Sequence, residues 1–258
     1  MNWDRVVGWR RRARAVMDYM RDPMVVKYMG VSFSGYGEDH ILFHLHPQRR
    51  GFYVEVGAFQ PRRASNTYKL YLRGWRGITI EPNPDVATSF KKVRPRDTHL
   101  AVGVSKSATT LTYHRFTAPT INSFVPDWQQ ASGIKIVDRI PIACATLSDI
   151  LDEHCPEQRV DLLSIDCEGH DMEVLESLDW SRYRPTVVIL EDMDEFFESA
   201  RRSERSPMRS FMVERDYCLA SQTVFSFFYV DRHAFSKNNR RAGFRLSNSQ
   251  ITGLALPD

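Results

Sequence analysis

Short apolar runs alternate with stretches of helical periodicity through most of the chain. Strands are predicted at residues 51–57, 77–80, 98–104, 160–165 and 185–190. Helices are predicted between and after them, at 65–72, 85–92, 146–154 and 171–178. Alternation of strands and helices at this spacing is typical of βαβ units around a parallel sheet. The crossover connections of such units are right-handed.

The alternation is interrupted by an insertion at residues 105–143. Its pattern predicts strands at 109–116 and 134–143, on either side of a polar loop that contains prolines and a glycine. A hairpin-like insertion on a rigid scaffold is a common place for a lid or a substrate loop. The aromatic side chains of Tyr113, Phe124 and Trp128 within it are suited to stacking on a sugar.

The C-terminal part returns to regular structure and closes the predicted sheet. A helix is expected at 207–215, and strands at 217–223 and 224–230 form an antiparallel pair. These patterns divide the chain into an N-terminal extension (1–34), a main domain with its insertion (35–232) and a C-terminal extension (233–258). A short helix at 38–46 opens the main domain.

The N-terminal extension is the most basic part of the chain. Residues 1–28 predict an amphipathic helix, in which four arginines crowd between positions 10 and 14. Two interpretations stand. The helix docks on the domain with a solvated basic face, or it meets anionic lipid or an acidic partner.

Composition indicates an ordinary globular protein of 258 residues. Hydrophobic residues make up 42% and charged residues 26%, so disorder, collagen and coiled coil are disfavoured. No apolar run reaches the roughly 18–20 residues that span a bilayer, and no secretory signal is seen. The net charge of +3 is too balanced to indicate nucleic-acid binding. Four cysteines without CxxC spacing indicate reduced thiols and a cytoplasmic location, with peripheral membrane contact through residues 1–28 left open.

The ends of the first two strands carry residues suited to a nucleoside. Gly57 ends the first strand and lets a ligand approach the backbone. Phe59 and Arg62 break the GxGxxG pattern, which argues against a dinucleotide. Glu81 ends the second strand, 24 positions after Gly57, where an acid commonly accepts both ribose hydroxyls.

Acidic residues gather after the fourth and fifth strands. Asp166, Glu168 and His170 follow the fourth strand, and Glu191 and Asp192 end the fifth. Carboxylates at adjacent strand ends could hold a base for a substrate hydroxyl, with Asp166, Glu168 and His170 as catalytic candidates. Asp166, Glu191 and Asp192 could instead bind Mg²⁺ through oxygens. The simpler interpretation is helix capping and solvated acids.

Several of these segments, in this order and spacing, resemble one family. They are Gly37-Glu38-Asp39, residues 51–58, Ser65-Asn66-Thr67, Gly74-Trp75, Gly77-Ile78, residues 80–84, Ala101-Val102 and residues 165–170. Together they are similar to the FkbM-type S-adenosylmethionine-dependent methyltransferases over roughly residues 35–195. Where this family more often has Asp and Asn in the first motif, the chain has Glu55 and Phe59.

The resemblance implies an α/β fold of the class I methyltransferase type, Rossmann-like, with a mostly parallel seven-stranded sheet and helices on both faces. S-adenosylmethionine would be the cofactor. The residues implied to contact it are Glu55 and Gly57 at the methionine part, Ser65 and Asn66 at the amino-acid end, Glu81 at the ribose, Pro82 and Asn83 beside the adenosine, Ala101 and Val102 at the adenine, and Asp166 below the methyl group. The family acts mostly on hydroxyl oxygens of glycans or natural products.

Three alternatives to an O-methyltransferase remain. An NAD(P)-linked oxidoreductase lacks its GxGxxG support, and a non-catalytic nucleoside-binding module would keep the fold without turnover. A nucleic-acid methyltransferase is suggested by arginine pairs, but Asp166-Cys167-Glu168-Gly169 stands where an Asp/Asn-Pro-Pro-aromatic motif is usual. We therefore expect a small-molecule or glycan acceptor and no nucleic acid. The identity of the base, the use of Mg²⁺ and assembly into a homo-oligomer stay open.

Overall fold

The computed structural model describes residues 17, 30–46, 50–126, 133–155, 157, 159–193 and 206–234. The chain divides into two units, Met1–Ser32 and Phe33–Asp258, and the second holds all the elements below. Apart from Met17, the helix expected over 1–28 lies outside the described residues. The same is true of the C-terminal extension beyond residue 234 and of Trp128.

A seven-stranded sheet forms the centre of the second unit. Its strands are β1 (Phe52–Val56), β2 (Arg76–Ile80), β3 (Thr98–Leu100), β7 (Leu162–Ile165), β8 (Val187–Glu191), β9 (Tyr217–Gln222) and β10 (Ser226–Asp231). They lie in the order β3-β2-β1-β7-β8-β10-β9, and β10 alone runs antiparallel to its neighbours β8 and β9. This topology confirms the predicted mostly parallel α/β sheet with its antiparallel closing pair.

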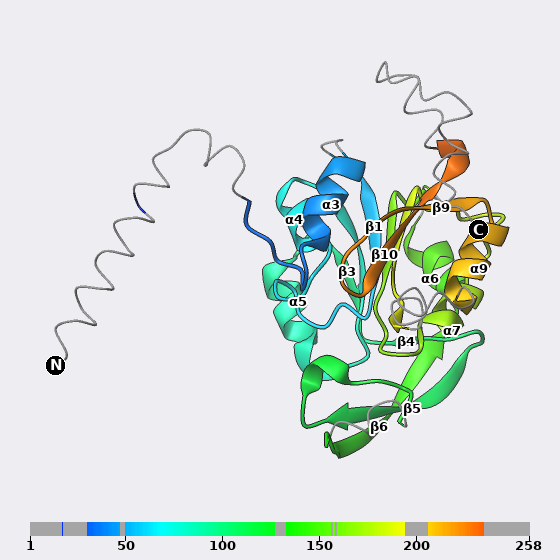
Figure 1. Ribbon diagram of the computed structural model, residues 1–258. Coiled ribbons are helices and arrows are strands. Elements are labelled where there is room, and N and C mark those ends of the chain that lie inside the picture. Colours follow the sequence, from blue (N-terminus) through cyan, green and yellow to red (C-terminus); the bar gives the residue numbers. More distant parts are fainter. Residues whose placement is uncertain are drawn as a thin grey trace. The chain divides into compact units, whose positions relative to one another are not determined.

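Helices cover both faces of this sheet (Figure 1). On one side lie α3 (Glu38–Leu45), α4 (Tyr68–Leu72) and α5 (Ala87–Val93), which follows the 3-10 turn η1 (Pro84–Val86). On the other lie α6 (Leu147–His154), α7 (Asp171–Glu176) and α9 (Pro207–Glu214). Thr146 caps α6 by accepting a hydrogen bond from the backbone N–H of Asp149, as its sequence predicts.

Two hydrophobic cores, one on each face, hold the layers together. Successive residues of a strand point to opposite faces of a sheet. Val54 and Val56 accordingly pack with α6, α7 and α9, whereas Tyr53 packs with α3 and α4. The same alternation separates Leu163 from Leu162 in β7. Central strands buried on both faces explain the apolar runs in the sequence.

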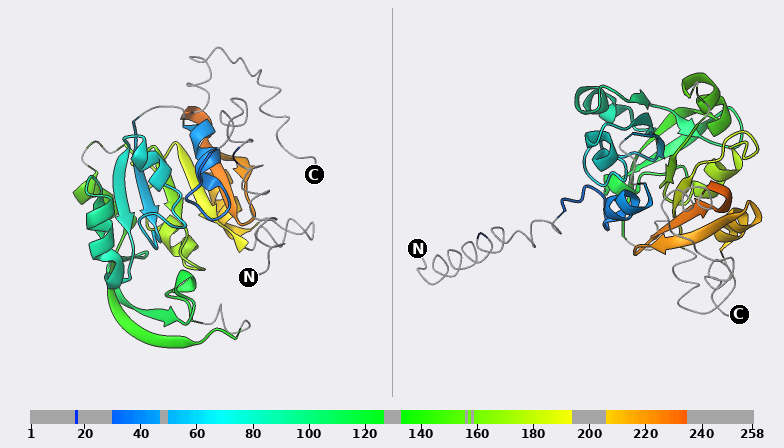
Figure 2. Two further views of the ribbon diagram at one scale, coloured as in Figure 1. Left: turned by 90° about the vertical axis from the view of Figure 1, so that its left-hand side faces the viewer. Right: turned by 90° about the horizontal axis from the view of Figure 1, so that it is seen from above.

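The insertion builds a second, three-stranded sheet. Its strands are β4 (Gly103–Val104), β5 (Thr109–Phe116) and β6 (Ile136–Ala145), in the order β4-β6-β5. β5 and β6 are antiparallel, which confirms the predicted hairpin, and Figure 2 shows the pair curving away from the main sheet. A single strand over 98–104 was a wrong prediction, because β3 ends at Leu100 and Gly103 pairs instead with Cys144 of β6.

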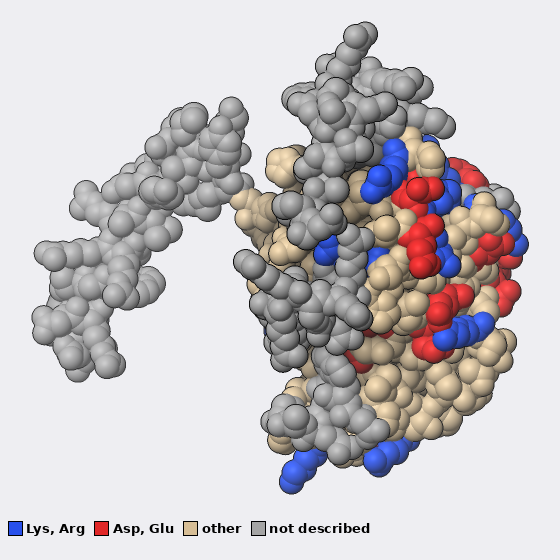
Figure 3. Space-filling model, turned by 45° about the vertical axis from the view of Figure 1, so that its right-hand side comes forward, with Lys and Arg blue, Asp and Glu red and all other residues tan. Residues whose placement is uncertain are grey.

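The surface in Figure 3 carries acidic and basic side chains side by side. Lys106 pairs with both Glu173 and Glu176. Exposed pairs of this kind contribute little to stability. Among the described residues, the structure contains no helix with the length and apolar character to span a bilayer.

Gly57 marks the closest approach of two strand ends. Its φ is +77°, and a Cβ built on it would lie 1.7 Å from the carbonyl oxygen of Asp166. Gly57→Ala is expected to lower the free energy of unfolding by about 2–4 kcal/mol, because both strain and a backbone clash result. Gly133→Ala is the matched control, since Gly133 has φ +74° but nothing within 4 Å of the added atom. The control should lose only about 1–2 kcal/mol. Urea unfolding measures both, and equal losses would refute the close contact.

Candidate active site

A pocket of about 420 Å³ opens at the carboxyl ends of the central parallel strands. Its floor comes from strand ends and the residues that follow them: Gly57 after β1, Glu81 after β2, Asp166 after β7 and Glu191 at the end of β8. Ligands of open α/β sheets bind at this edge. The size is within the range of small-molecule sites, roughly 300–1,000 Å³.

The walls of the pocket come from segments that are distant in sequence. The insertion contributes the side chains of Tyr113, Asn122 and Phe124. Tyr36, just before α3, and Phe225, between β9 and β10, contribute a second wall and contact each other edge to face with ring centroids 5.4 Å apart. The pocket is therefore aromatic on two sides and acidic at its floor.

Glu81 is oriented by the backbone around it. Its carboxylate accepts hydrogen bonds from the N–H groups of Phe59 (2.8 Å) and Asn83 (2.9 Å). The hydroxyl of Tyr113 donates a third bond at 3.2 Å. Burial nevertheless raises the pKa of Glu81, because desolvation outweighs these three bonds. A fixed carboxylate that lines the pocket has the placement expected of a ribose-binding acid.

Strained backbone surrounds the floor of the pocket. Phe59, Ala64 and Glu168 have positive φ values of 45°, 50° and 53°, although none is glycine. All three line the pocket. Such conformations cost about 1–3 kcal/mol each and cluster at binding and catalytic sites. Their concentration here supports the assignment of this pocket as the functional site.

Glu55 lies beneath the pocket and does not line it. Its side chain is 5% exposed, and its carboxylate pairs with the guanidinium of Arg94 at 3.1 Å. It also accepts bonds from the hydroxyls of Ser65 and Thr67 and from the N–H of Asn66. Both side chains are thus engaged in hydrogen bonds inside the protein, and contact of Glu55 or Ser65 with the cofactor stays a prediction.

Asn66 is the residue that this buried network presents to the pocket. It follows Ser65, its side-chain amide donates to Ser164 Oγ at 3.0 Å, and it lines the cavity. Sequence reasoning missed the partner that makes this arrangement possible, Arg94, which is 1% exposed. Nothing in the local pattern around Arg94 distinguishes it from a surface arginine.

The remaining adenosine candidates occupy varied positions. Pro82 lines the pocket. Asn83 orients Glu81 through its backbone, while its side chain caps η1 by accepting from the N–H of Asp85. Ala101 is exposed and Val102 packs against the hydrophobic core, and neither lines the pocket. Contact of these two residues with an adenine stays a prediction.

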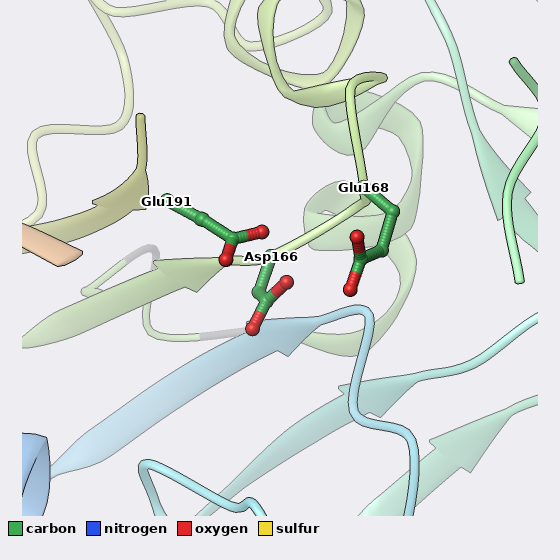
Figure 4. Close-up of side chains that lie close together, drawn as sticks. All are labelled: Asp166, Glu168 and Glu191. Atoms are coloured by element: carbon green, nitrogen blue, oxygen red, sulfur yellow. The ribbon is translucent and has the colours of Figure 1, made fainter. Parts of the chain in front are cut away.

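Three carboxylates converge on the opposite part of the floor. Oxygens of Asp166, Glu168 and Glu191 all lie within 4.8 Å of one another. Figure 4 shows Glu191 and Glu168 on either side of Asp166, both directed toward it. Asp166 and Glu168 follow β7 and Glu191 ends β8, so the parallel pairing of these strands brings the acids together.

The three acids alter one another's protonation. Burial and the negative charge of Glu191 raise the pKa of Asp166 well above its usual range. Burial and Glu168 raise the pKa of Glu191 to about 7. A hydrogen bond joins the two, with Asp166 as the donor that keeps the proton. Glu191 is thus an acceptor poised near neutral pH, where a general base is most effective.

His170 and Asp192 do not join this group. The Nε2 of His170 lies 3.1 Å from the carbonyl oxygen of Val104, the ring is 8% exposed, and burial lowers its pKa. Asp192 is fully buried and accepts a hydrogen bond from the hydroxyl of Ser206. Neither residue lines the pocket, and a role for either at the reacting centre stays a prediction.

Comparison with known proteins identifies a family for the chain. A family model described as the methyltransferase FkbM domain matches residues 55–219, which is more than half of the chain. The chain belongs to the FkbM methyltransferase family. This family match supports S-adenosylmethionine-dependent methylation as the general activity of the chain.

One solved structure gives a distant likeness. It is a TehB-like SAM-dependent methyltransferase from Corynebacterium glutamicum, at 12% identity and a TM-score of 0.36. The alignment covers 90% of this chain and all of the other. Among curated proteins the search finds no match.

Glu81→Gln tests the ribose-binding role of this acid. The amide keeps the size of the side chain but loses one acceptor oxygen, so we expect binding of S-adenosylhomocysteine to weaken about tenfold or more. Calorimetric titration measures the change. Glu214→Gln is the matched control, because its carboxylate lies on the surface with 75% exposure. Equal affinity of the two variants would remove Glu81 from the binding site.

Proposed function

We propose that this protein transfers a methyl group from S-adenosylmethionine to a hydroxyl oxygen of a sugar or a related natural product. The observation that carries the proposal is that one pocket holds a single carboxylate bound by backbone N–H groups and, apart from it, a hydrogen-bonded pair of carboxyl groups. Glu81, fixed by backbone N–H groups, lies after β2, and the hydrogen-bonded pair of Asp166 and Glu191 lies at the ends of β7 and β8.

The residues that line the pocket fit the cofactor. Glu81 would accept the ribose hydroxyls, the glycine at position 57 leaves room at the end of β1, and Asn66 would meet the amino-acid end. When bound, the cofactor supplies an electrophilic methyl group on a positively charged sulfur. Carboxylates on the pocket floor suit that positive charge.

The acid pair has the properties of a proton acceptor. A sugar hydroxyl is a weak nucleophile until its proton leaves, and a carboxylate within about 3 Å can take it. Asp166 keeps its proton and donates a hydrogen bond to Glu191, so the Glu191 carboxylate is the group that can accept a proton near neutral pH. Glu168 adds negative charge beside Glu191 and raises its basicity.

The walls of the pocket suit a polar ring with an apolar face. Tyr36, Phe124 and Phe225 offer aromatic surfaces, and Asn122 offers an amide. Sugars present this combination of C–H faces and hydroxyl edges. Alignment of an acceptor hydroxyl over the pair of Asp166 and Glu191 would lower the activation free energy by several kcal/mol, because orientation contributes much of the catalysis of such displacements.

A divalent cation is the second chemistry that the three carboxylates allow. Asp166, Glu168 and Glu191 would hold Mg²⁺ through oxygens, and Asp192, included in the sequence prediction, is replaced by Glu168. A bound ion would lower the pKa of the acceptor hydroxyl. A turnover assay with EDTA, then with Mg²⁺ restored, separates the two chemistries.

Asp166→Ala removes the donor to Glu191 and is expected to reduce turnover by roughly two to four orders of magnitude, the usual contribution of a positioned acid or base. Affinity for S-adenosylhomocysteine should stay largely unchanged, because Glu81 and Asn66 remain. Methyl transfer to a pool of glycans and sugar conjugates, measured with a radiolabelled methyl group, gives the rate. Glu214→Ala, at an exposed position, is the control. Normal turnover of Asp166→Ala would remove this residue from the mechanism.

Glu191 makes both rate and stability depend on pH. Below pH of about 7 the carboxyl is protonated and cannot accept a proton, so kcat/KM should fall as the pH drops through this value. The folded state binds this proton more tightly than the unfolded chain. Its contribution to stability is therefore complete below the unfolded pKa of about 4.5 and is lost as the pH rises through about 7.

Glu191→Gln is expected to separate the two effects. It should abolish most turnover, and at pH of about 8 it should raise the free energy of unfolding by roughly 1–2 kcal/mol, since no buried charge remains. Denaturant unfolding at several pH values is the measurement. Glu153→Gln, largely exposed beside His154, is the control. A variant that is destabilised at alkaline pH would contradict the raised pKa.

A further inference from the structure

A second cavity, of about 780 Å³, lies at the other end of the main sheet. Phe52 begins β1 and Arg76 begins β2, and both line it, as does Asp161 just before β7. The two ends of a five-residue strand are about 17 Å apart. The cavity shares no lining residue with the active-site pocket. It is therefore separate from the candidate site for methyl transfer.

Arginine is the dominant residue of this cavity. Five line it, from segments before β1, after α4, at the start of β2, after α5 and before β7: Arg50, Arg73, Arg76, Arg96 and Arg159. Two carboxylates, Glu157 and Asp161, also line it, so the net charge of its lining is +3. The whole chain carries the same net charge on 258 residues, which shows how strongly positive charge is concentrated here.

The two acids neutralise only part of this charge. Asp161 is 3% exposed, accepts a hydrogen bond from the N–H of Phe52 and pairs with Arg159 at 2.7 Å. Glu157 approaches Arg76 at 3.9 Å, with both side chains largely exposed. Within the described part of the chain, no carboxylate pairs with Arg50, Arg73 or Arg96. These three arginines therefore leave uncompensated positive charge in the lining of the cavity.

Arg73 is fixed in position beside the cavity. Its guanidinium lies over the ring of Phe43, 4.1 Å from the centroid, and its Nη1 is buried. Arg73 therefore adds positive charge to the lining, although its buried Nη1 is not accessible to a ligand in the cavity.

Helix ends explain part of the cluster but not all of it. The C-termini of α4 and α5 carry partial negative charge, which favours nearby cations such as Arg73 and Arg96. Arg96 indeed donates to the carbonyl oxygen of Tyr71 in α4. Arg50, Arg76 and Arg159 precede or begin strands, however, and no helix end accounts for them.

We propose that this cavity binds a phosphate or diphosphate group. The planar guanidinium fork matches phosphate oxygens in two-point hydrogen bonds, and several arginines around one cavity suit a multiply charged group better than a single carboxylate. The source is either a soluble phosphorylated compound or the headgroup of a lipid. The proposal does not depend on the methyl-transfer activity, because the two cavities are separate.

The test titrates the full-length protein with inorganic pyrophosphate by calorimetry at low ionic strength. In parallel, it measures co-sedimentation with phosphatidylcholine vesicles that contain phosphatidic acid. The double variant Arg50→Gln/Arg76→Gln should bind the effective probe about tenfold more weakly or worse. Added salt should weaken binding to the wild type.

The matched control is Arg139→Gln/Arg232→Gln, which removes the same two charges from exposed positions outside the cavity. Affinity for S-adenosylhomocysteine and thermal unfolding verify that each variant is folded. Saturable binding that is lost only in the cavity variant supports the site, and the probe that shows it identifies a soluble or a lipid ligand. Failure of both probes to saturate the wild type, or equal loss in both variants, overturns the proposal.

Discussion

The buried ion pair between Glu55 and Arg94 holds together the parts on which the candidate site depends. Both side chains are almost fully buried, and each alone would leave a costly unpaired charge in the interior. Arg94 also contacts Asp97 and the hydroxyl of Tyr53, so β1 is tied to the end of α5. The hydroxyls and N–H groups of residues 65–67 donate hydrogen bonds to the Glu55 carboxylate. The segment that carries Asn66 is therefore fixed at the edge of the pocket.

Parallel pairing then determines the chemistry of the floor. β1, β2, β7 and β8 end at one edge of the sheet. Glu81 and the pair of Asp166 and Glu191 therefore lie in one pocket, although they are far apart in the sequence. The same pairing places the starts of these strands at the opposite edge, where the arginine cavity lies. The acidic pocket and the arginine cavity thus lie at opposite edges of one sheet, separated by the length of its apolar strands.

The sequence pattern was sufficient for most of the fold. Apolar runs and helical periodicity located the strands, and four residues chosen for their positions at strand ends, Gly57, Glu81, Asp166 and Glu191, lie in one pocket. Period-two alternation explains why Asp192 does not join them: Glu191 lines the pocket, so its neighbour points away and accepts a hydrogen bond from Ser206.

Other features of the site depend on interaction partners that lie far apart in the sequence. Glu55 and Arg94 are 39 residues apart, and nothing in the local pattern links them. His170 was singled out for its chemistry, but the backbone oxygen of Val104, 66 residues earlier, takes its ring nitrogen. The aromatic wall formed by Tyr36 and Phe225 joins the two ends of the domain, a contact that only the folded chain reveals.

The insertion has its own hydrogen-bonded sheet, and this has an evolutionary consequence. β5 and β6 pair with each other and with β4 but share no ladder with the main sheet, while their connecting segment supplies Asn122 and Phe124 to the pocket. Mutations there can reshape this wall of the pocket while the ladder of the main sheet stays intact. Sequence change in the insertion can therefore alter what the pocket admits at little cost to the fold.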